Sequence, residues 1–414
     1  MKKRSLLTLL LISLIFNFVY AQVPHDPDYK EHPYLNTITT AVPFLQIAPD
    51  SRSGAMGDIG VATSADPSAQ NHNPAKYVYN KNRFGVSFSY SPWLHSLVND
   101  VSLLSLSGYY RITRMDAIAM SLRYFGLGEI NFTTDRGDPL GTYKPNEFSI
   151  DFTYARKLID ELSIAITPRF IYSDLTAGQS VGQMETSPGM AGAADISLFY
   201  QQDFESKKLF NQTVRVGLNI QNLGNKIKYT DEHRRDFIPS NLKLGIGYTM
   251  EFDEYNALSI AMDINKLLVP TPAIYRMNYA TDTTRELVYG LASESVGEGI
   301  FHSFYDAPGG FREEMREITI GIGLEYSYRN LLFIRGGYFY ENPYKGGRNF
   351  FTVGAGIKYN IIGIDMAYLI AINQHHPLEN SLRFSLTFDL ISFDKKDVKQ
   401  QGKNPKQGET PKKQ

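Results

Sequence analysis

Few residue patterns in this chain could support catalysis. A G-x-S-x-G pattern, which can present a nucleophilic serine in hydrolases, occurs once, from Gly178 to Gly182 with Ser180 at its centre. That arrangement requires a strand before the serine and a helix after it, whereas the surrounding residues predict a loop. The sequence lacks the metalloprotease pattern H-E-x-x-H, the Walker phosphate loop and the dinucleotide-binding pattern G-x-G-x-x-G. We therefore expect no enzyme activity.

The patterns that could hold a metal or a cofactor are equally sparse. His375 and His376 are adjacent in a predicted loop, and Glu379 could add one carboxylate, but no third histidine lies nearby. The chain has no cysteine, which excludes disulfides and thiolate metal sites. Three G-x-G pairs begin at Gly245, Gly321 and Gly354; they fall within predicted strands, where glycine permits bends and close packing. We therefore expect no cofactor and no metal site.

The first residues predict export. Lys2, Lys3 and Arg4 precede an apolar run from Leu6 to Phe18. A small residue, Ala21, follows where a signal peptidase would cleave. The run is shorter than the roughly 20 residues of a membrane-spanning helix. Residues 1–21 are therefore predicted to be a secretory signal peptide that is removed. The formal net charge is −1, and basic residues gather at the two ends, so the middle of the chain is acidic. This charge distribution does not favour binding of nucleic acid.

Apolar residues alternate with polar ones in fourteen segments between residues 83 and 393, and such alternation predicts strands with two different faces. The segments are 84–90, 104–110, 118–124, 148–154, 162–166, 196–200, 214–220, 242–248, 258–264, 318–326, 332–338, 353–359, 362–368 and 382–388. The number is even, as in bacterial outer-membrane barrels. A mean hydropathy of −0.27 is compatible with a membrane barrel, because only every second side chain faces lipid.

Fourteen charged residues in these segments or close to their ends fall in the phase opposite to the apolar set. They are Arg111, Arg123, Asp151, Arg169, Asp195, Arg215, Lys243, Asp263, Glu325, Arg335, Lys358, Asp365, Arg383 and Asp389. Arg or Lys on the lipid face at mid-bilayer costs about 2 to 4 kcal/mol, so these side chains should line the lumen. Connections after odd strands are long and those after even strands are short. This parity is typical of outer-membrane barrels, and it predicts long extracellular loops and periplasmic termini.

The parts that flank the predicted barrel have a different character. Residues 22–50 are rich in proline and tyrosine and lack a period, so we expect an irregular periplasmic segment. Residues 51–82 are rich in glycine, serine, alanine, aspartate and asparagine and are predicted to form a plug, or hatch, inside the lumen of the 83–393 barrel. A chain folded in a crowded lumen needs tight turns and positive φ values, which glycine supplies. Residues 394–414 are polar and lysine-rich, and we expect a disordered periplasmic tail.

The combination of hatch and strands resembles the FadL-like superfamily of outer-membrane barrels, in which an N-terminal hatch fills a fourteen-stranded barrel. The hatch residues that carry the resemblance are Arg52, Gly54, Met56, Gly57, Gly60, Val61, Ala62, Asp66 and Pro67, followed by Asn73, Pro74 and Ala75. Within the superfamily, the chain most resembles the PorV-like family of the Bacteroidota type IX secretion system. Three stretches carry this resemblance: the sequence from Ser51 to Thr63, the strand end from Asn219 to Gly224 and the strand start from Pro239 to Gly245. The sibling PorQ proteins are a further possibility.

This resemblance implies a shuttle protein of the outer membrane without a cofactor. Its partners would be the large translocon barrel, the C-terminal signal domains of secreted cargo, the surface sortase-like attachment complex and outer-membrane lipid. Apolar residues in the predicted external loops are candidates for partner binding, and a self-packed lid over the barrel mouth is the alternative. The candidates are Trp93, Leu94, Leu267, Leu268, Tyr275, Tyr279, Tyr289, Phe301, Phe304, Tyr305 and Phe311. The competing function is a FadL-type channel for long-chain fatty acids or other hydrophobic compounds.

Overall fold

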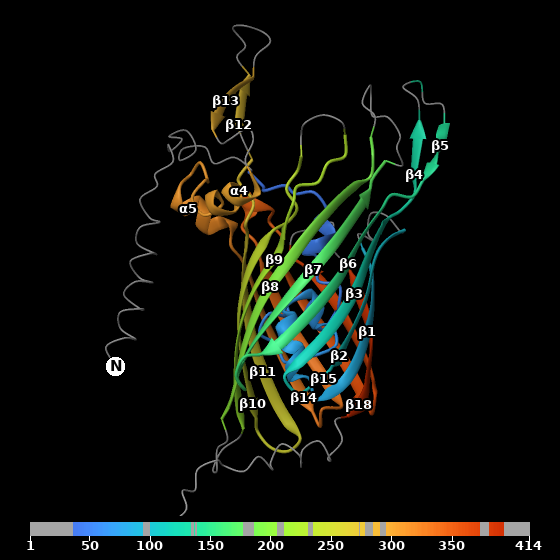
Figure 1. Ribbon diagram of the computed structural model, residues 1–414, viewed down its shortest axis with the longest axis vertical. Helices are drawn as coiled ribbons and strands as arrows, with labels where there is room; N and C mark the ends of the chain where they lie inside the picture. The colour runs from blue at the N-terminus through green and yellow to red at the C-terminus, as the bar shows by residue number, and fades with distance from the viewer. Residues whose placement is uncertain are drawn as a thin grey trace, which may run out of the picture.

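A closed antiparallel barrel forms most of the molecule in the computed structural model (Figure 1). The structure describes residues 36–93, 100–133, 136, 139–176, 186–204, 211–230, 235–272, 274–277, 285–289, 295–372 and 381–392. The predicted signal peptide and the predicted tail lie outside these residues, as does the first part of the predicted 22–50 segment.

Fourteen strands make the barrel, which confirms the predicted number and places. They are β1 (Asn82–Pro92), β2 (Val101–Arg111), β3 (Asp116–Leu127), β6 (Asn146–Lys157), β7 (Leu162–Asp174), β8 (Gly189–Phe204), β9 (Gln212–Gly224), β10 (Asn241–Glu251), β11 (Asn256–Leu267), β14 (Thr319–Tyr328), β15 (Leu332–Tyr340), β16 (Phe350–Tyr359), β17 (Ile362–Ala371) and β18 (Leu382–Ser392). Each pairs with the barrel strands before and after it in the chain, and β1 closes the barrel by pairing with β18.

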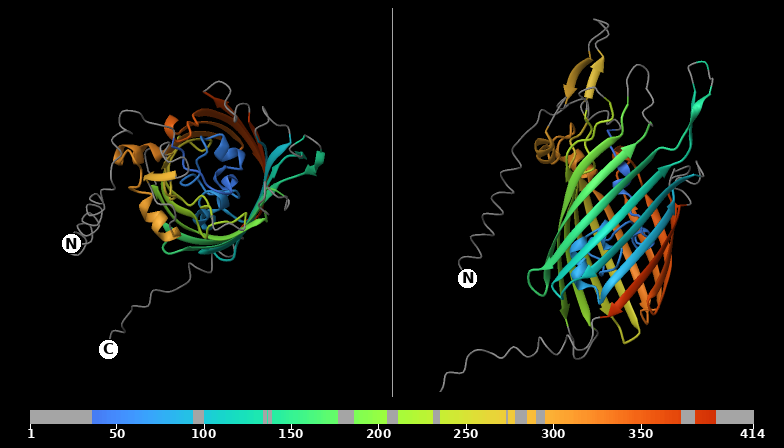
Figure 2. Two further views of the ribbon diagram at one scale, coloured as in Figure 1. Left: turned by 90° about the horizontal axis from the view of Figure 1, so that it is seen from above. Right: turned by 45° about the vertical axis from the view of Figure 1, so that its right-hand side comes forward.

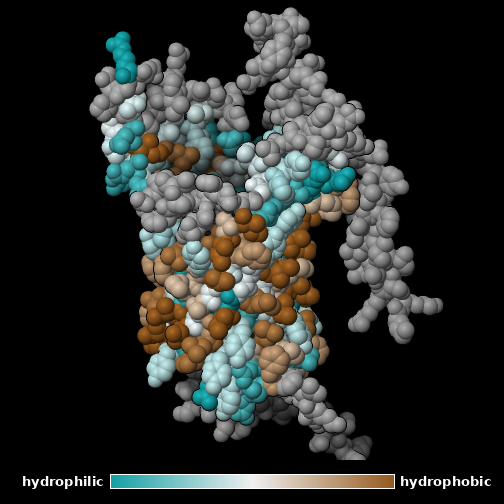
Figure 3. Space-filling view, turned by 180° about the vertical axis from the view of Figure 1, so that it is seen from behind, coloured by the Kyte–Doolittle hydropathy of each residue, from teal (hydrophilic) through white to brown (hydrophobic). Residues whose placement is uncertain are grey.

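The two faces of the wall separate apolar from charged side chains as the alternation predicted. Outward-facing residues such as Met120, Phe152 and Ile364 are 48%, 56% and 60% exposed. On the side of the barrel that Figure 3 draws, hydrophobic residues form a brown belt around the wall. All fourteen predicted lumen charges lie on the inner face. Eleven are buried, and Lys243, Lys358 and Asp365 are partly buried. The wall therefore presents an apolar surface to lipid and a polar surface to the lumen.

The connections obey the predicted parity, with short turns at one end of the barrel and long loops at the other. At the short-turn end, residues 329–331 join β14 to β15. Arg329 and Asn330 have φ values of 56° and 52°, as the two central residues of a type I′ turn require. The long loops contain further elements: β4 (Ile130–Thr133), β5 (Pro139–Tyr143), β12 (Ile274–Met277), β13 (Arg285–Tyr289), α4 (Val296–His302), α5 (Phe311–Glu314), η5 (Met315–Glu317) and η6 (Pro343–Lys345). None of the helices among the described residues has the length and hydropathy needed to span a membrane.

Residues 36–81 run through the inside of the barrel, and we call them the lumenal segment (Figure 2, left). Their elements are the short helices η2 (Pro43–Gln46), α3 (Ser51–Gly54), η3 (Ala69–Asn71) and η4 (Pro74–Tyr79). The segment begins at the long-loop end, where the Asn36 N–H donates to the Tyr344 carbonyl. It ends at the short-turn end, where Asn82 opens β1 opposite Ser392. The described chain therefore starts and finishes at opposite ends of the barrel.

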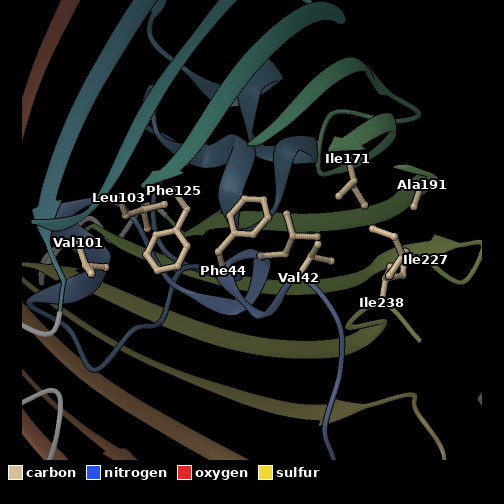
Figure 4. Packing of buried hydrophobic residues seen from close by; sticks show 10 residues of the cluster. Val42, Phe44, Val101, Leu103, Phe125, Ile171, Ala191, Ile227 and Ile238 are labelled. Atoms are coloured by element: carbon tan, nitrogen blue, oxygen red, sulfur yellow. The ribbon is translucent and has the colours of Figure 1, made fainter. Parts of the chain in front are cut away.

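The sequence analysis predicted that residues 22–50 form an irregular periplasmic segment, which would lie beside the short turns. The described part of that range begins instead at the long-loop end with Asn36 and enters the lumen by Asp50, which borders the lumenal cavity. Val42, Phe44 and Leu45 are buried there among side chains of the wall, and Figure 4 shows Phe44 facing Phe125. The two rings stack with centroids 6.1 Å apart. Burial of these apolar side chains favours the observed path.

Candidate functional site

The start of α3 is fixed by an aspartate that serves two partners. The Asp50 carboxylate accepts a hydrogen bond from the Ser53 N–H at 2.9 Å, which caps the helix. Its other oxygen lies 2.9 Å from Nε2 of His72. Asp50 and His72 are both buried. This contact joins the beginning of the lumenal segment to its second half, so the segment is braced internally.

Arg52 connects the lumenal segment to the wall through a buried chain of ion pairs. Its guanidinium donates to both oxygens of Glu325, at 2.8 and 2.9 Å, and lies 2.7 Å from Asp66. Glu325 also accepts from Arg335 at 2.6 Å, and Arg335 contacts Asp365 at 2.5 Å. Because each charge has a partner of opposite sign, the lumen can hold these groups away from bulk water.

The glycine-rich stretch of the segment passes very close to the wall. Asp263 of β11 accepts hydrogen bonds from the N–H groups of Gly60 and Val61 at 2.7 and 2.9 Å. Gly57 adopts a φ of +73° and donates to Thr352 at 2.9 Å. Glycines of the wall face residues 55–62 at these crossings: Gly217, Gly245, Gly247, Gly321, Gly323, Gly337 and Gly354. A side chain at any of them would overlap the segment, which explains the strand glycines as sites of close backbone approach.

The segment meets the wall again at Arg383 of β18. Asp58 pairs with Arg383. Gly54 of α3 passes close to the same side chain, because a side chain at this position would overlap Arg383. The strands β14 to β17 separate β18 from β11, which carries Asp263, so the segment is held at two well-separated points of the wall.

The Asn73-Pro74-Ala75 sequence ties η4 to two neighbouring strands. Asn73 caps the helix by accepting from the Ala75 N–H at 3.2 Å, and its amide donates to the Leu198 carbonyl of β8 at 2.9 Å. The Ala75 carbonyl accepts from the Ser163 hydroxyl of β7 at 2.7 Å. Pro74 occupies the first turn of the helix, where it needs no hydrogen-bond partner for its nitrogen. The motif therefore fixes the segment just before it enters β1.

A cavity of about 740 Å³ occupies the short-turn half of the lumen. Asp50, Arg52 and the residues from Ser64 to Ser68 bound it on the side of the lumenal segment, and turn residues such as Asn330 and Asn360 bound its mouth. Its walls are rich in charged and hydroxyl-bearing residues. Such a lining suits water and polar groups better than a hydrocarbon ligand.

The long loop between β11 and β14 carries a compact folded unit, residues 295–317, which we call the platform. It is anchored by buried ion pairs: Lys345 contacts Glu313 at 2.5 Å and Glu317 at 3.0 Å. Lys266 contacts Glu314 at 3.0 Å and Glu317 at 2.7 Å. The sequence analysis missed this cluster. The glutamate-rich stretch from Arg312 to Glu317 was the feature of the sequence that could have indicated the cluster.

Two carboxyl groups of the platform have raised pKa values. Burial raises the pKa of Asp306 to about 6. The hydrogen bonds that Asp306 accepts from the N–H and hydroxyl of Thr271 lower the pKa and so oppose this rise. Burial, together with the neighbouring carboxylate of Glu317, raises the pKa of Glu314 to about 7, and Lys266 opposes this rise. We therefore expect the attachment of the platform to the barrel to depend on pH.

The candidate partner-binding residues differ in their exposure. Phe301, Phe304 and Phe311 of the platform are 61%, 45% and 77% exposed, whereas Leu268 is 3% exposed and packed. Tyr305 and Leu267 are partly buried. Trp93 is also partly buried and packs against Phe339 and its neighbours at the barrel mouth. The placement of Leu94 and Tyr279 and the side chains of Tyr275 and Tyr289 lie outside what the structure describes.

The described residues do not include the serine and histidine patterns that the sequence analysis considered. Ser180, His375, His376 and Glu379 lie outside them. Within the described ranges, no group of three or more histidine or acidic side chains is placed so as to hold a metal ion.

Comparisons with known proteins identify a family. A model of the family "Type IX secretion system protein PorV" matches residues 30–274, which is more than half of the chain. The curated protein sequences contain no match. Among solved structures, the chain is similar to the toluene transporter TbuX of Ralstonia pickettii, with 13% identity, coverage of 84% of this chain and 99% of that chain, and a TM-score of 0.45.

Two other solved barrels have comparable similarity. The toluene transporter TodX of P. putida has 9% identity, coverage of 84% of this chain and 100% of that chain, and a TM-score of 0.47. A FadL homologue of Pseudomonas aeruginosa has 11% identity, coverage of 86% and 99%, and a TM-score of 0.39. The family match agrees with the closed fourteen-stranded barrel and its apolar outer belt. The chain therefore belongs to the PorV family of type IX secretion system proteins, which places it in the outer membrane.

Proposed function

We propose that this chain receives cargo for the type IX secretion system at the outer surface of the outer membrane. In this proposal it binds the C-terminal signal domain of a secreted protein at the large translocon barrel. It then carries the cargo to the surface sortase-like attachment complex. The long loops face the outside and the short turns face the periplasm. Membership of the family supports the secretion role.

The observation that carries the proposal is the contrast between the two ends of the molecule. The lumen is crossed by residues 36–81, which are held by ion pairs such as Arg52 with Glu325 and Asp58 with Arg383. The long-loop end, in contrast, carries ordered elements that project from the barrel mouth, including the hairpin of β12 and β13 (Figure 1). A segment that is held across the lumen, together with the elements that project at the long-loop end, favours recognition of protein partners by the loops.

The test replaces the β12–β13 hairpin, residues 274–289, with a short Gly-Ser linker. The matched control replaces residues 130–143, which contain the β4–β5 hairpin at the same end of the barrel. Both variants are first checked for surface expression. We expect the first replacement to abolish pull-down of a cargo signal domain and the second to leave it unchanged. Normal capture and secretion with both replacements would contradict the proposed loop role.

The competing function is a channel for long-chain fatty acids or other hydrophobic compounds. The charged lumen and the polar cavity give this function less support, because a hydrocarbon solute would have to pass buried ion pairs. Purified barrel in liposomes should therefore not accelerate the entry of a long-chain fatty acid. Faster entry through the intact protein than through protein-free liposomes would favour the channel.

A further inference from the structure

The platform lies outside the circumference of the barrel. Figure 2, viewed from above, shows α4 and α5 beyond the ring of strands, on the side of β10 and β11. The chain enters the platform from β11 and leaves it into β14, so it stands over the upper ends of these two paired strands. Any exposed side chain on its lower side would face the membrane that surrounds the wall.

One face of the platform is fixed to the barrel. Glu313 and Glu314 of α5 are buried and paired with Lys345 and Lys266. On α4, a side chain at Gly299 would contact the ring of Phe237, and Ser303, one turn later, is 0% exposed. Because both helices are held on these faces, their remaining faces have defined orientations.

The other faces carry large apolar side chains. Phe301 lies on α4 and Phe304 in the turn directly after it, while Phe311 opens α5 and Met315 opens η5. Phe301 is 61% exposed and Phe304 45% exposed. Phe311 is 77% exposed and Met315 46% exposed. Exposed apolar clusters of this kind mark interaction sites. The backbone that carries these exposed side chains is held in place by the buried ion pairs of Glu313 and Glu314.

This exposed surface continues the lipid-facing wall. In Figure 3 the overhang has hydrophobic residues on its lower side, next to the brown belt of the barrel. Ile260 of β11 and Ile322 and Leu324 of β14 lie farther down the two strands that carry the platform and are 44%, 43% and 47% exposed. Arg312 is exposed beside Phe311. Aromatic residues together with arginine are typical of elements that lie in the headgroup region of a bilayer.

We propose that the platform rests on the outer leaflet of the outer membrane as a lateral anchor. Phe301, Phe304 and Phe311 insert among the lipid headgroups, and Arg312 meets their phosphates. The anchor holds the long loop at a fixed height above the bilayer. This inference does not depend on the proposed cargo function, because the lipid contact needs no protein partner.

The experiment uses tryptophan fluorescence, because the chain has one tryptophan, Trp93. Phe301, Phe304 and Phe311 are each replaced by tryptophan in a W93F background. If W93F prevents folding, the same substitutions are made with Trp93 retained and its signal subtracted. The full-length protein is reconstituted in vesicles of phosphatidylcholine and phosphatidylglycerol, with or without lipid brominated near the headgroup. I130W, in the β4–β5 hairpin and 42% exposed in the parent chain, is the matched control.

We expect brominated lipid to reduce the emission at positions 301 and 311 about twofold, since interfacial elements insert roughly 5–10 Å into the bilayer boundary. The I130W signal should not change. Quenching no greater than that of I130W would overturn the proposal. Protection from aqueous iodide without quenching by brominated lipid would also overturn it and would indicate a protein partner or a second copy of the chain.

Discussion

Arg52 forms ion pairs with Asp66 of the lumenal segment and with Glu325 of the wall. Arg52→Ala would leave Asp66 without its guanidinium partner and Glu325 with Arg335 alone. Breaking a buried ion pair costs about 3 to 5 kcal/mol, so we expect the variant barrel to unfold at a clearly lower temperature in a heat-modifiability gel assay. Arg52→Lys should recover only part of the loss, because lysine lacks the two-pronged geometry.

A double-mutant cycle separates this contact from a general effect of losing charge. If Arg52 and Glu325 interact directly, the R52A/E325A variant should lose less stability than the two single losses combined. Simple additivity would show that the contact contributes nothing of its own. Arg312→Ala, on the exposed face of the platform, is the matched surface control and should change stability by about 0.5 kcal/mol or less.

For single residues, the sequence predicted which face of the wall a side chain occupies better than it predicted which residues that side chain contacts. Alternation placed Glu325 and Arg335 on the lumen face, and the structure confirms both. Their mutual contact follows from the register of β14 on β15, where the two residues are opposite each other. The contact from Arg52 could not be derived in this way, because the lumenal segment has no period and no fixed register with any strand.

Among the elements, the platform combines a rigid attachment with groups that titrate. Asp306 has a folded pKa of about 6 against 3.8, and Glu314 about 7 against 4.5. The folded platform therefore binds more protons than the unfolded chain between about pH 4 and pH 7, and its stability should fall as the pH rises through this window. Glu317, Lys266 and Lys345 are the neighbouring charged groups.

The measurement is hydrogen exchange of residues 295–317 at about pH 5 and about pH 7.5, corrected for the intrinsic pH dependence of exchange. Asp306→Asn should reduce the difference in protection, since asparagine does not titrate and can still accept from Thr271. Glu254→Gln, in an exposed short turn, should leave the difference as it is. Greater protection at the higher pH in the unmodified protein would contradict the expected sign.

Strands were easier to predict than the segment inside them. Each wall strand separates lipid from lumen, so its sequence must alternate, and the fourteen segments were visible for that reason. The lumenal segment does not separate two different environments as a wall strand does, and its apolar residues Val42, Phe44 and Leu45 show no period. Their burial depends on pockets formed by distant strands, for example around Phe125 and Ile238. Local sequence alone does not contain that information.

For the whole molecule, the lipid-facing belt determines which charges the wall tolerates. Leu324 lies near the middle of β14 and is 47% exposed, while Tyr328 lies on the same face at the short-turn end and is 38% exposed. Leu324→Arg should cost about 2 to 4 kcal/mol and Tyr328→Arg about 0 to 1 kcal/mol, because the penalty depends on depth in the bilayer. Reversible urea unfolding in lipid vesicles measures both. Equal losses would show that β14 has a different position relative to the membrane.

The path of the chain through the barrel leads to a test of sidedness. The lumenal segment begins at the long-loop end with Asn36, so its start should be on the same side of the membrane as the loops. The chain has no cysteine, and Thr37, Ile130 and Glu254 are exposed, so single cysteines at these positions report their own accessibility. With the loops outside, a membrane-impermeant maleimide should label T37C and I130C in intact cells. It should label E254C, in a short turn, only after the cells are broken. Labelling of I130C but not T37C in intact cells would contradict the path of the segment, and labelling of E254C alone would reverse the orientation of the barrel.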